Sequence, residues 1–161
     1  MKTLQKVQKI NRVTDGTLNL SLLYARDEKC TDPIIGYVAS DWTGDKVDRK
    51  STSGYFFKFL GCSVSWASKK QHTMPLLSTE SEFVALSMAT SEACWLCNLI
   101  HRFSGSQRAA VFHEGNVSVI SLWKNLQFNH KQKHINVKKK FIRENVFTKK
   151  VMLKHNSTNE Q

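Results

Sequence analysis

Alternating apolar and polar positions in the first half of the chain predict an antiparallel meander. Three β-rich segments follow one another between Gly, Pro and charged residues: IIGYVASDW from residue 34, GYFFKFLG from residue 54 and CSVSWASKKQ from residue 62. The pair Gly61-Cys62 indicates a tight hairpin between the second and third segments. An earlier segment, LNLSLLYARDEK from residue 18, alternates enough to predict one more strand before a turn at Pro33.

Apolar positions recur at helical spacing farther along the chain. Ser78 or Thr79 can cap a helix that has an acid in its first turn, and the helix should end before Gly105. After it the pattern predicts a strand over 109–113, a helix over about 117–125, a basic loop, a helix over about 138–146 and a last strand, VMLKH. Three antiparallel strands, a helix and then alternating strands and helices predict an α/β fold with a mixed sheet.

The strongly basic composition indicates what kind of partner the protein binds. The 161 residues suggest one domain, and their formal net charge is +11. From residue 129 to residue 161, nine Lys or Arg face only two acids. Such a block favours a polyanionic partner, usually nucleic acid, although a solvated basic tail is the alternative.

The apolar runs do not indicate a membrane protein. None approaches the ~20 residues of a membrane span, and the charged N-terminus lacks the apolar centre of a signal peptide. We therefore expect an intracellular protein, cytoplasmic or nuclear, without a membrane partner.

Cysteine and tryptophan residues are expected to serve the core. Cys94-Trp-Leu-Cys97, with His101 beyond it, offers three zinc ligands but no fourth nearby, so buried free thiols on a helix are the better interpretation. Three tryptophans are expected to pack in the core rather than to stack on nucleic-acid bases: Trp42, Trp66 and Trp95.

Two acids lie at positions where catalytic or metal-binding residues are common. Asp41 lies at the end of a strand that otherwise reads as buried, where an ionised carboxylate is costly unless it is paired or binds a metal. Glu82 lies in the first turn of the long predicted helix. If this helix crosses the meander, the two carboxylates can converge. Taken alone, each can equally be an ordinary acid at a strand end or a helix N-terminus.

A series of motifs runs in order along residues 34–161. The chain has GYVASDWTGD, STSGY, VSWASKKQ, STESEF and EACWL, then EGN, QKHINV and FIRE. These resemble the ribonuclease H domain of copia-type retrotransposon Pol polyproteins, which has G-Y-x-D-x-D-W-A-G-D, S-T-S-G-Y, W-x-S-K-K-Q, S-T-E-A-E-Y, E-x-x-W-L, E-D-N and K-H-I-D. Residues 1–33 look like a degenerate junction with the reverse transcriptase, and residues 34–161 like the ribonuclease H-like domain.

The resemblance implies a ribonuclease H-like fold, with a mixed five-stranded sheet and helices on its faces. It implies four carboxylates around two Mg²⁺ (or Mn²⁺) ions ~3.5–4 Å apart, which hydrolyse the RNA of an RNA–DNA hybrid. It also implies a partner that is such a hybrid or another nucleic acid, and an ancestral covalent link to reverse transcriptase. Six lysines are candidate phosphate contacts, with a polar strand end or solvated helix face as the alternative: Lys69, Lys70, Lys131, Lys133, Lys138 and Lys139.

Only half of the implied metal ligands are kept. Asp41 matches the family's first aspartate and Glu82 its glutamate. Gly115 stands at the aspartate of E-D-N, and Asn136 stands at the acid of K-H-I-D. Glu114 should not replace the ligand lost beside it, because neighbouring residues of a strand point to opposite faces, and His113 should share the face of position 115.

Two formal negative charges then face two ions that together carry +4, so we expect at most one weakly bound divalent ion. Ala39, where the family has aspartate, and Lys140, where it has histidine, point the same way. Three hypotheses stay open. The first is an impaired nuclease that uses Asp41 and Glu82 with help from Asn136. The second is a non-catalytic nucleic-acid-binding remnant or domesticated module. The third is an unfolded relic, because the chain stops before the family's A-D-x-x-T-K ending.

Overall fold

The computed structural model describes residues 20–22, 24–25, 32–41, 50–72, 78–114 and 133–155. Within these ranges the elements follow one another as β1 (Ile34–Asp41), β2 (Thr52–Phe59), β3 (Cys62–Lys70), α2 (Ser78–Ser104), β4 (Ala110–Glu114), α4 (Lys133–Phe147) and β5 (Val151–His155). The predicted helix over 117–125 and the basic loop after it lie outside the described residues.

The strands and helices predicted inside these ranges are confirmed, with one exception. The segment over residues 18–29 was expected to be a strand, but its described residues, 20–22 and 24–25, form none. Leu20, Leu22 and Tyr24 are exposed. An alternating pattern makes a strand only where a sheet edge offers it both hydrogen bonds and burial, and none of the five described strands pairs with these residues.

The five described strands form one mixed sheet in the order β3-β2-β1-β4-β5. β1, β2 and β3 are the predicted antiparallel meander, whereas β4 and β5 run parallel to β1. β2 turns into β3 through Leu60 and Gly61, whose φ angles of 49° and 86° match a two-residue type I′ hairpin. Because β1 and β4 are parallel neighbours, their carboxyl ends, at Asp41 and Glu114, lie toward the same edge of the sheet.

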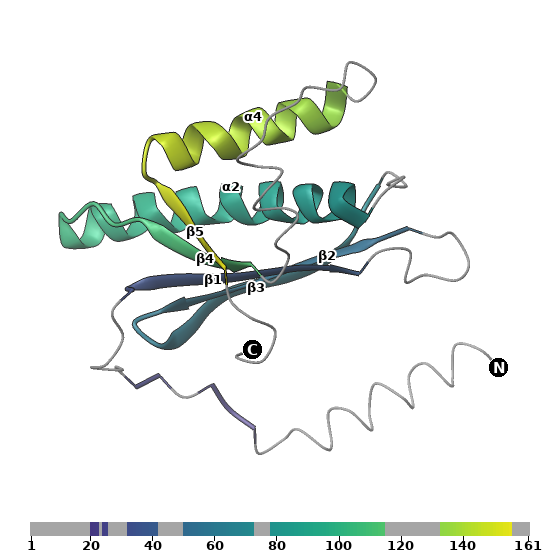
Figure 1. Ribbon diagram of the computed structural model, residues 1–161. Helices are drawn as coiled ribbons and strands as arrows, with labels where there is room; N and C mark the ends of the chain where they lie inside the picture. Colours follow the sequence, from purple (N-terminus) through teal and green to yellow (C-terminus); the bar gives the residue numbers. More distant parts are fainter. Residues whose placement is uncertain are drawn as a thin grey trace.

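Both described helices lie on the same face of the sheet, with α2 over β1 and β2 and α4 beside α2 (Figure 1). Strand residues that alternate toward this face are buried with the helices in one core. Its large fully buried members include Phe57, Phe112, Ile34, Leu86 and Ile142. No described helix covers the opposite face. We call that face the open face.

α2 is long and apolar enough to cross a membrane by length and composition alone. Its apolar side is buried against the sheet, however, through Phe83, Leu86 and Ala89. Farther along, Glu92 accepts a 2.6 Å hydrogen bond from the hydroxyl of Ser65 on β3. These contacts make α2 the core helix of the domain.

The two cysteines of α2 are free thiols that pack between elements, as predicted. Cys94 donates a hydrogen bond to the side-chain oxygen of Asn145 on α4 at 3.0 Å, and Cys97 is part of the core. Burial raises the pKa of both thiols, which keeps them in the less reactive protonated form.

The prediction that the tryptophans pack in the core is wrong for the two that the structure describes. Trp66 of β3 is 59% exposed and Trp95 of α2 is 54% exposed, while Trp42 lies outside the described residues. Ser65 faces α2 through its bond to Glu92, so strand alternation turns Trp66 to the open face. Trp95 lies on the solvent side of α2.

A methyl group added at Gly36 would have no room. An ideal Cβ there would lie 2.5 Å from a ring carbon of Phe112 and 2.6 Å from one of Phe57. Gly36→Ala should therefore lower the free energy of unfolding by about 1–3 kcal/mol, measured as a lower urea midpoint at an unchanged slope. Gly54→Ala on β2 is the matched control, because its Cβ would meet its nearest atoms at 3.7 Å and 3.9 Å. Equal stability of the two variants would contradict this packing.

Candidate active site

Buried hydrogen bonds join the first turn of α2 to β1 and β2. Ser81 donates its hydroxyl proton to the carbonyl of Ser78 at 2.6 Å. Because a hydroxyl carries one proton, the 2.9 Å contact between the Ser81 and Ser40 oxygens is a bond donated by Ser40. The side-chain amide of Gln71 donates to the hydroxyl of Ser53 at 2.7 Å and to the carbonyl of Ser81 at 2.9 Å. Ser53, Gln71 and Ser81 are buried, and the two bonds of Gln71 are shielded from water.

Each of the two retained acids follows one of these bonded serines in the sequence. Asp41 follows Ser40 at the end of β1, and Glu82 follows Ser81 in the first turn of α2. The 2.9 Å bond between the serines therefore brings the backbones of both acids to the same end of the sheet. Asp41 is exposed and Glu82 is half-buried. Since Ser40 faces α2, alternation directs Asp41 to the open face, so a ligand shared by both acids would lie at the edge of the sheet.

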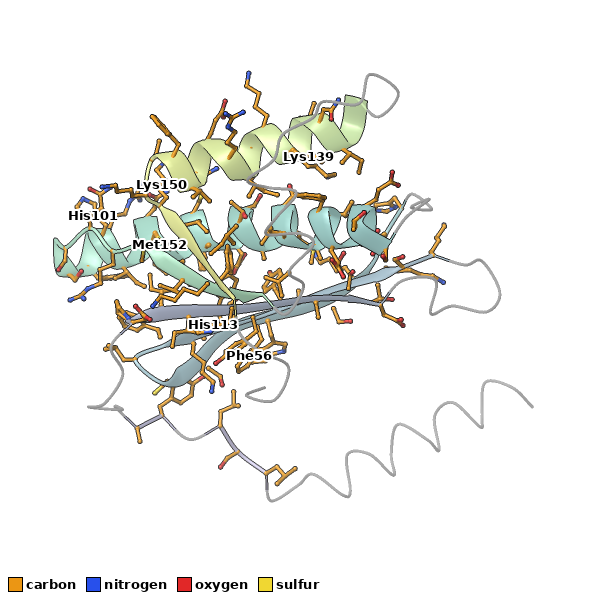
Figure 2. All side chains as sticks on the ribbon, viewed as in Figure 1. Phe56, His101, His113, Lys139, Lys150 and Met152 are labelled. Carbon is orange, nitrogen blue, oxygen red and sulfur yellow. The ribbon has the colours of Figure 1, made fainter. Side chains whose placement is uncertain are left out.

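Asn136 reaches the same end of the domain through α4. It lies half-buried in the first turn of α4, one turn before Lys139. Lys139 lies on α4 (Figure 2), and its ammonium is 5.0 Å from the ring centroid of Phe83, which directly follows Glu82. The amino-terminal half of α4 therefore lies beside the amino-terminal turns of α2. Gly115, the other predicted position of a lost carboxylate, lies outside the described residues.

The end of β4 presents His113 to the open face. Phe112 points into the core, and alternation turns His113 to the other side, where its half-buried ring stacks on Tyr37 with centroids 5.5 Å apart. Ala39 follows Tyr37 on the same face, two residues before Asp41, and is exposed. Position 39 is therefore a second place on β1, besides Asp41, where a carboxylate would stand near the end of β4.

The described residues do not fit the implied two-ion centre. Among the described residues, no group of three or more His, Cys, Asp or Glu side chains could hold a metal ion. Asp41 and Glu82 would supply two negative charges and Asn136 a neutral oxygen, whereas two Mg²⁺ ions carry four positive charges and need several anionic oxygens around them. One ion at most is compatible with this donor set. The expected orientation of Glu114 concerns a side chain outside the described part of the structure.

Lys69 and Lys70 lie at the same edge of the sheet as Asp41. Asp41 pairs with Thr52, and Thr52 pairs with Lys70, in one row across three strands. The strand spacing puts the backbones of Asp41 and Lys70 about 10 Å apart. Both lysines are exposed. The other candidate phosphate contacts are half-buried on α4 (Lys138 and Lys139) or have side chains outside the described ones (Lys131 and Lys133).

Sequence reasoning did not identify the residues that position the two acids. The signal for them was present, because Ser40, Ser53 and Gln71 are polar residues at positions whose alternation predicts burial. Buried polar side chains need partners, so three of them at one end of a meander indicate a hydrogen-bonded contact with another element.

Comparisons of the sequence found curated relatives, while no protein-family model matches. The chain is 45% identical over 101 residues to "Secreted RxLR effector protein 161" of Plasmopara viticola, covering 63% of this chain and 70% of that protein. It is 37% identical over 131 residues to the "Retrovirus-related Pol polyprotein from transposon TNT 1-94" of Nicotiana tabacum, covering 81% of this chain and 10% of that protein. To the polyprotein of transposon RE1 of Arabidopsis thaliana it is 33% identical over 159 residues, covering 98% of this chain and 11% of that protein. The chain thus spans about a tenth of these Pol polyproteins.

Comparisons of the structure found ribonuclease H folds. RNase H1 of the archaeon Halobacterium salinarum NRC-1 matches with a TM-score of 0.56 and 12% identity, over 78% of this chain and 86% of that one. LC11-RNase H1, solved in complex with an RNA/DNA hybrid, matches with a TM-score of 0.53 and 11% identity, over 79% of this chain and 87% of that one. The protease–reverse transcriptase of prototype foamy virus matches with a TM-score of 0.52 and 14% identity, over 89% of this chain and 20% of that one. At these identities the likeness concerns the fold.

The Ser40–Ser81 bond can be tested by removing one hydroxyl. Ser81→Ala should lower the free energy of unfolding by about 1–2 kcal/mol, because Ser40 loses its acceptor in a partly buried place. Ser91→Ala is the matched control on α2, since its hydroxyl bonds the carbonyl of Ser87 at 3.2 Å on the exposed side of the helix. That change should stay within about 0.5 kcal/mol in the same urea titration. Similar losses in both variants would rule out a special role for Ser81.

Proposed function

The chain belongs to the family of ribonuclease H-like domains of copia-type retrotransposon Pol polyproteins, and from that membership we propose that it binds RNA–DNA hybrids but hydrolyses their RNA strand weakly or not at all. The proposal concerns this domain alone, because the chain spans 10% and 11% of the two Pol polyproteins compared. The choice of an RNA–DNA hybrid as the ligand is supported by the fold that the chain shares with LC11-RNase H1, whose structure was solved in complex with an RNA/DNA hybrid.

The observation that carries the proposal is an incomplete acid set at a well-built end of the sheet. Neutral hydrogen bonds from Ser40 and Gln71 hold the first turn of α2 on the sheet, which supports a fixed backbone beside Asp41 and Glu82. Asp41 and Glu82 remain there. Gly115 and Asn136, in contrast, are neutral where the family has acids.

Hydrolysis in this family depends on divalent ions that activate a water and stabilise the leaving oxygen. Two carboxylates and the amide oxygen of Asn136 could hold one such ion weakly, Mg²⁺ or Mn²⁺, and this is the basis for residual activity. The chain's own residues would do the rest. Asp41 and Glu82 would orient a water at the edge of the sheet, and nearby lysines would hold the phosphates of the hybrid.

Binding does not need the missing acids. The net charge of +11 attracts a polyanion without a metal, and Lys69 and Lys70 lie at the edge that carries Asp41. In a Pol polyprotein such a domain would work next to a reverse transcriptase, supplied by the same or another chain inside the cell. Cooperative unfolding would distinguish this folded module from an unfolded relic.

Restoring the lost acids should restore cleavage. We expect Gly115→Asp combined with Asn136→Asp, and the same pair with Ala39→Asp added, to cut a labelled RNA–DNA hybrid at least about 100-fold faster than the natural chain in Mg²⁺ or Mn²⁺. Adding Asp41→Asn to the best repaired variant should abolish that gain. If the natural chain cuts as fast as the repaired ones, the lost carboxylates do not matter. If the triple variant alone gains activity, position 39 carries the first acid.

Hybrid binding should depend on the lysines at the Asp41 edge. We expect Lys69→Gln plus Lys70→Gln to weaken binding, measured by anisotropy in EDTA between about 50 and 200 mM salt, and to reduce the salt slope by about 2. Lys149→Gln plus Lys150→Gln removes the same charge at the opposite end of the strands, where β5 begins. This control should keep the natural slope. Equal slopes in the two double variants would mean that binding follows net charge rather than this edge.

A further inference from the structure

Four rings stand in one row across the open face of the sheet. Trp66 pairs with Phe56, Phe56 with Tyr37 and Tyr37 with His113, so one residue from each of β3, β2, β1 and β4 lies in the same register. Alternation puts all four on the face away from α2 and α4, as Figure 2 shows for Phe56 and His113. We call these four residues the ring row.

Three rings of the row, those of Phe56, Tyr37 and His113, contact one another in sequence. The centroids of Tyr37 and Phe56 are 6.3 Å apart, and those of Tyr37 and His113 are 5.5 Å apart in a stacked arrangement. Trp66, at one end of the row, is 59% exposed. The packed rings give the row a fixed geometry, and the indole of Trp66 is its most accessible surface.

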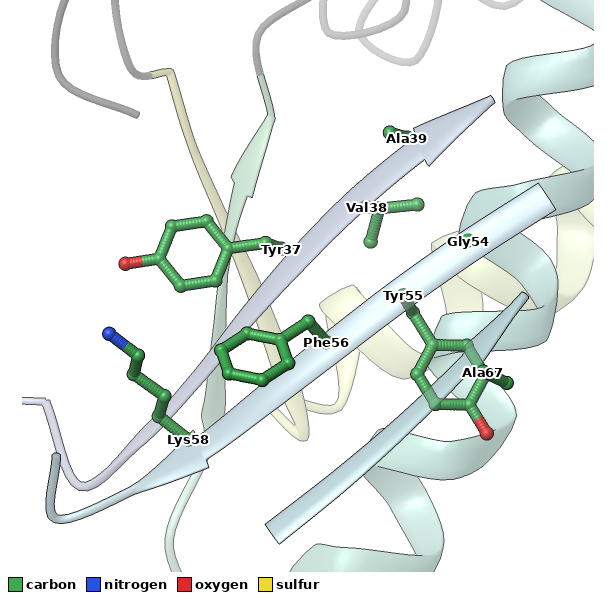
Figure 3. Close-up of a pocket in the computed structure, with 8 residues that line it drawn as sticks. All are labelled: Tyr37, Val38, Ala39, Gly54, Tyr55, Phe56, Lys58 and Ala67. Carbon is green, nitrogen blue, oxygen red and sulfur yellow. The ribbon is translucent and has the colours of Figure 1, made fainter. Parts of the chain in front are cut away.

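A cation accompanies the rings. The Lys58 ammonium lies 5.9 Å from the ring centroids of both Tyr37 and Phe56, and Figure 3 shows the three side chains together. At the other end of the row, Lys154 is the partner of His113 on β5, where it bonds Asp32 at 2.7 Å. Asp32 offsets the charge of Lys154, so the positive charge beside the rings comes from Lys58.

A hollow of about 570 Å³ lies beside the row, lined by Tyr37, Phe56, Lys58, Ala39 and Gly54. Ala39 and Gly54 are partners in the register row next to the ring row, so two small residues lie beside the rings. A Cβ at Gly54 would meet its nearest atoms at 3.7 Å and 3.9 Å, which leaves the space above it open. The hollow therefore offers open space beside the rings and next to Lys58.

We propose that the ring row and this hollow bind single-stranded nucleic acid, with bases stacked on Trp66 and Phe56 and a phosphate held by Lys58. Aromatic rings with flanking cations are the chemistry by which proteins hold single strands without sequence preference. The site lies next to the edge assigned to hybrids but uses other residues, and it goes beyond the function proposed there.

The charge of the face argues against a second copy of the chain as the occupant. A symmetric dimer through the ring row would bring Lys58 of one copy toward the row of the other, between two chains that each carry a net charge of +11. A polyanionic strand, in contrast, is attracted by Lys58 and by the net charge of the chain.

Two exposed tryptophans on different layers give a matched test. Binding of a labelled 12-nucleotide oligo(dT) is measured by anisotropy in EDTA for the natural chain, Trp66→Ala and Trp95→Ala. The 59% and 54% exposures of the two indoles are similar, and Trp95 lies on α2, away from the open face. We expect Trp66→Ala to raise the dissociation constant about tenfold or more and Trp95→Ala to leave it within about twofold. Trp66→Phe, which keeps a ring, should retain most of the affinity.

Ala39→Asp provides a second test in case Trp66→Ala is poorly folded. It adds a carboxylate beside the hollow at an exposed position and should weaken oligo(dT) binding. Equal affinities of Trp66→Ala and Trp95→Ala, or no effect of Ala39→Asp, would overturn the proposal. A natural dimer that Trp66→Ala converts to a monomer in sedimentation would also overturn it, by making a second copy the occupant. If the chain failed to bind hybrids in the experiment on Lys69 and Lys70, the oligo(dT) result would still stand. The two experiments use different nucleic acids and different variants, and they test different surface residues.

Discussion

The bond between Ser40 and Ser81 is the constraint on which the candidate site depends. It fixes the start of α2 on β1, and the bond between Glu92 and Ser65 fixes the same helix on β3 eleven residues later. Two such points set both the register of the helix and its direction across the sheet. A slip of one helical turn would move Glu82 by about 5.4 Å and take Phe83 and its neighbours out of the core. The position of the acid is therefore tied to the packing of the whole helix.

The hydrogen bonds described at this end of the sheet join neutral groups, so they do not depend on the acids of the candidate site. The bonds among Ser40, Ser53, Gln71 and Ser81 involve no carboxylate. Clustered carboxylates repel each other when no cation lies between them, so replacing one with Gly115 or Asn136 removes repulsion rather than support. Selection for stability alone would not keep such acids, whereas it would keep the serines and the glutamine.

Much of the fold could be predicted from the sequence, because β1, β2, β3 and α2 each have a periodicity that fits only one kind of element. Exposure could not. Trp66 and Trp95 were expected in the core because large aromatic residues usually are buried, and a single sequence does not reveal which sheet face the helices cover. The segment over residues 18–29 failed for a similar reason, since alternation predicts a strand without saying whether another strand will pair with it. For the site, motif spacing located Asp41 and Glu82. Their meeting at one end depends on contacts between residues 41 positions apart, as for Ser40 and Ser81, which no local pattern contains.

Ala39 connects the two binding surfaces inferred from this structure. Its side chain lies on the open face, after Tyr37 of the ring row and before Asp41 at the hybrid edge. An aspartate at this position, as in the related motif, would put a negative charge beside the hollow and repel a phosphate held by Lys58. Alanine leaves the hollow neutral and its rings accessible, while it removes a carboxylate from the edge. A single substitution on β1 can thus weaken a metal site, which requires negative charge. The same substitution can favour a phosphate-binding site, which negative charge would weaken. On this argument, alanine at position 39 would add to the effect of Gly115 and Asn136 at the proposed hydrolytic site, and it would favour the proposed single-strand site by the same absence of charge.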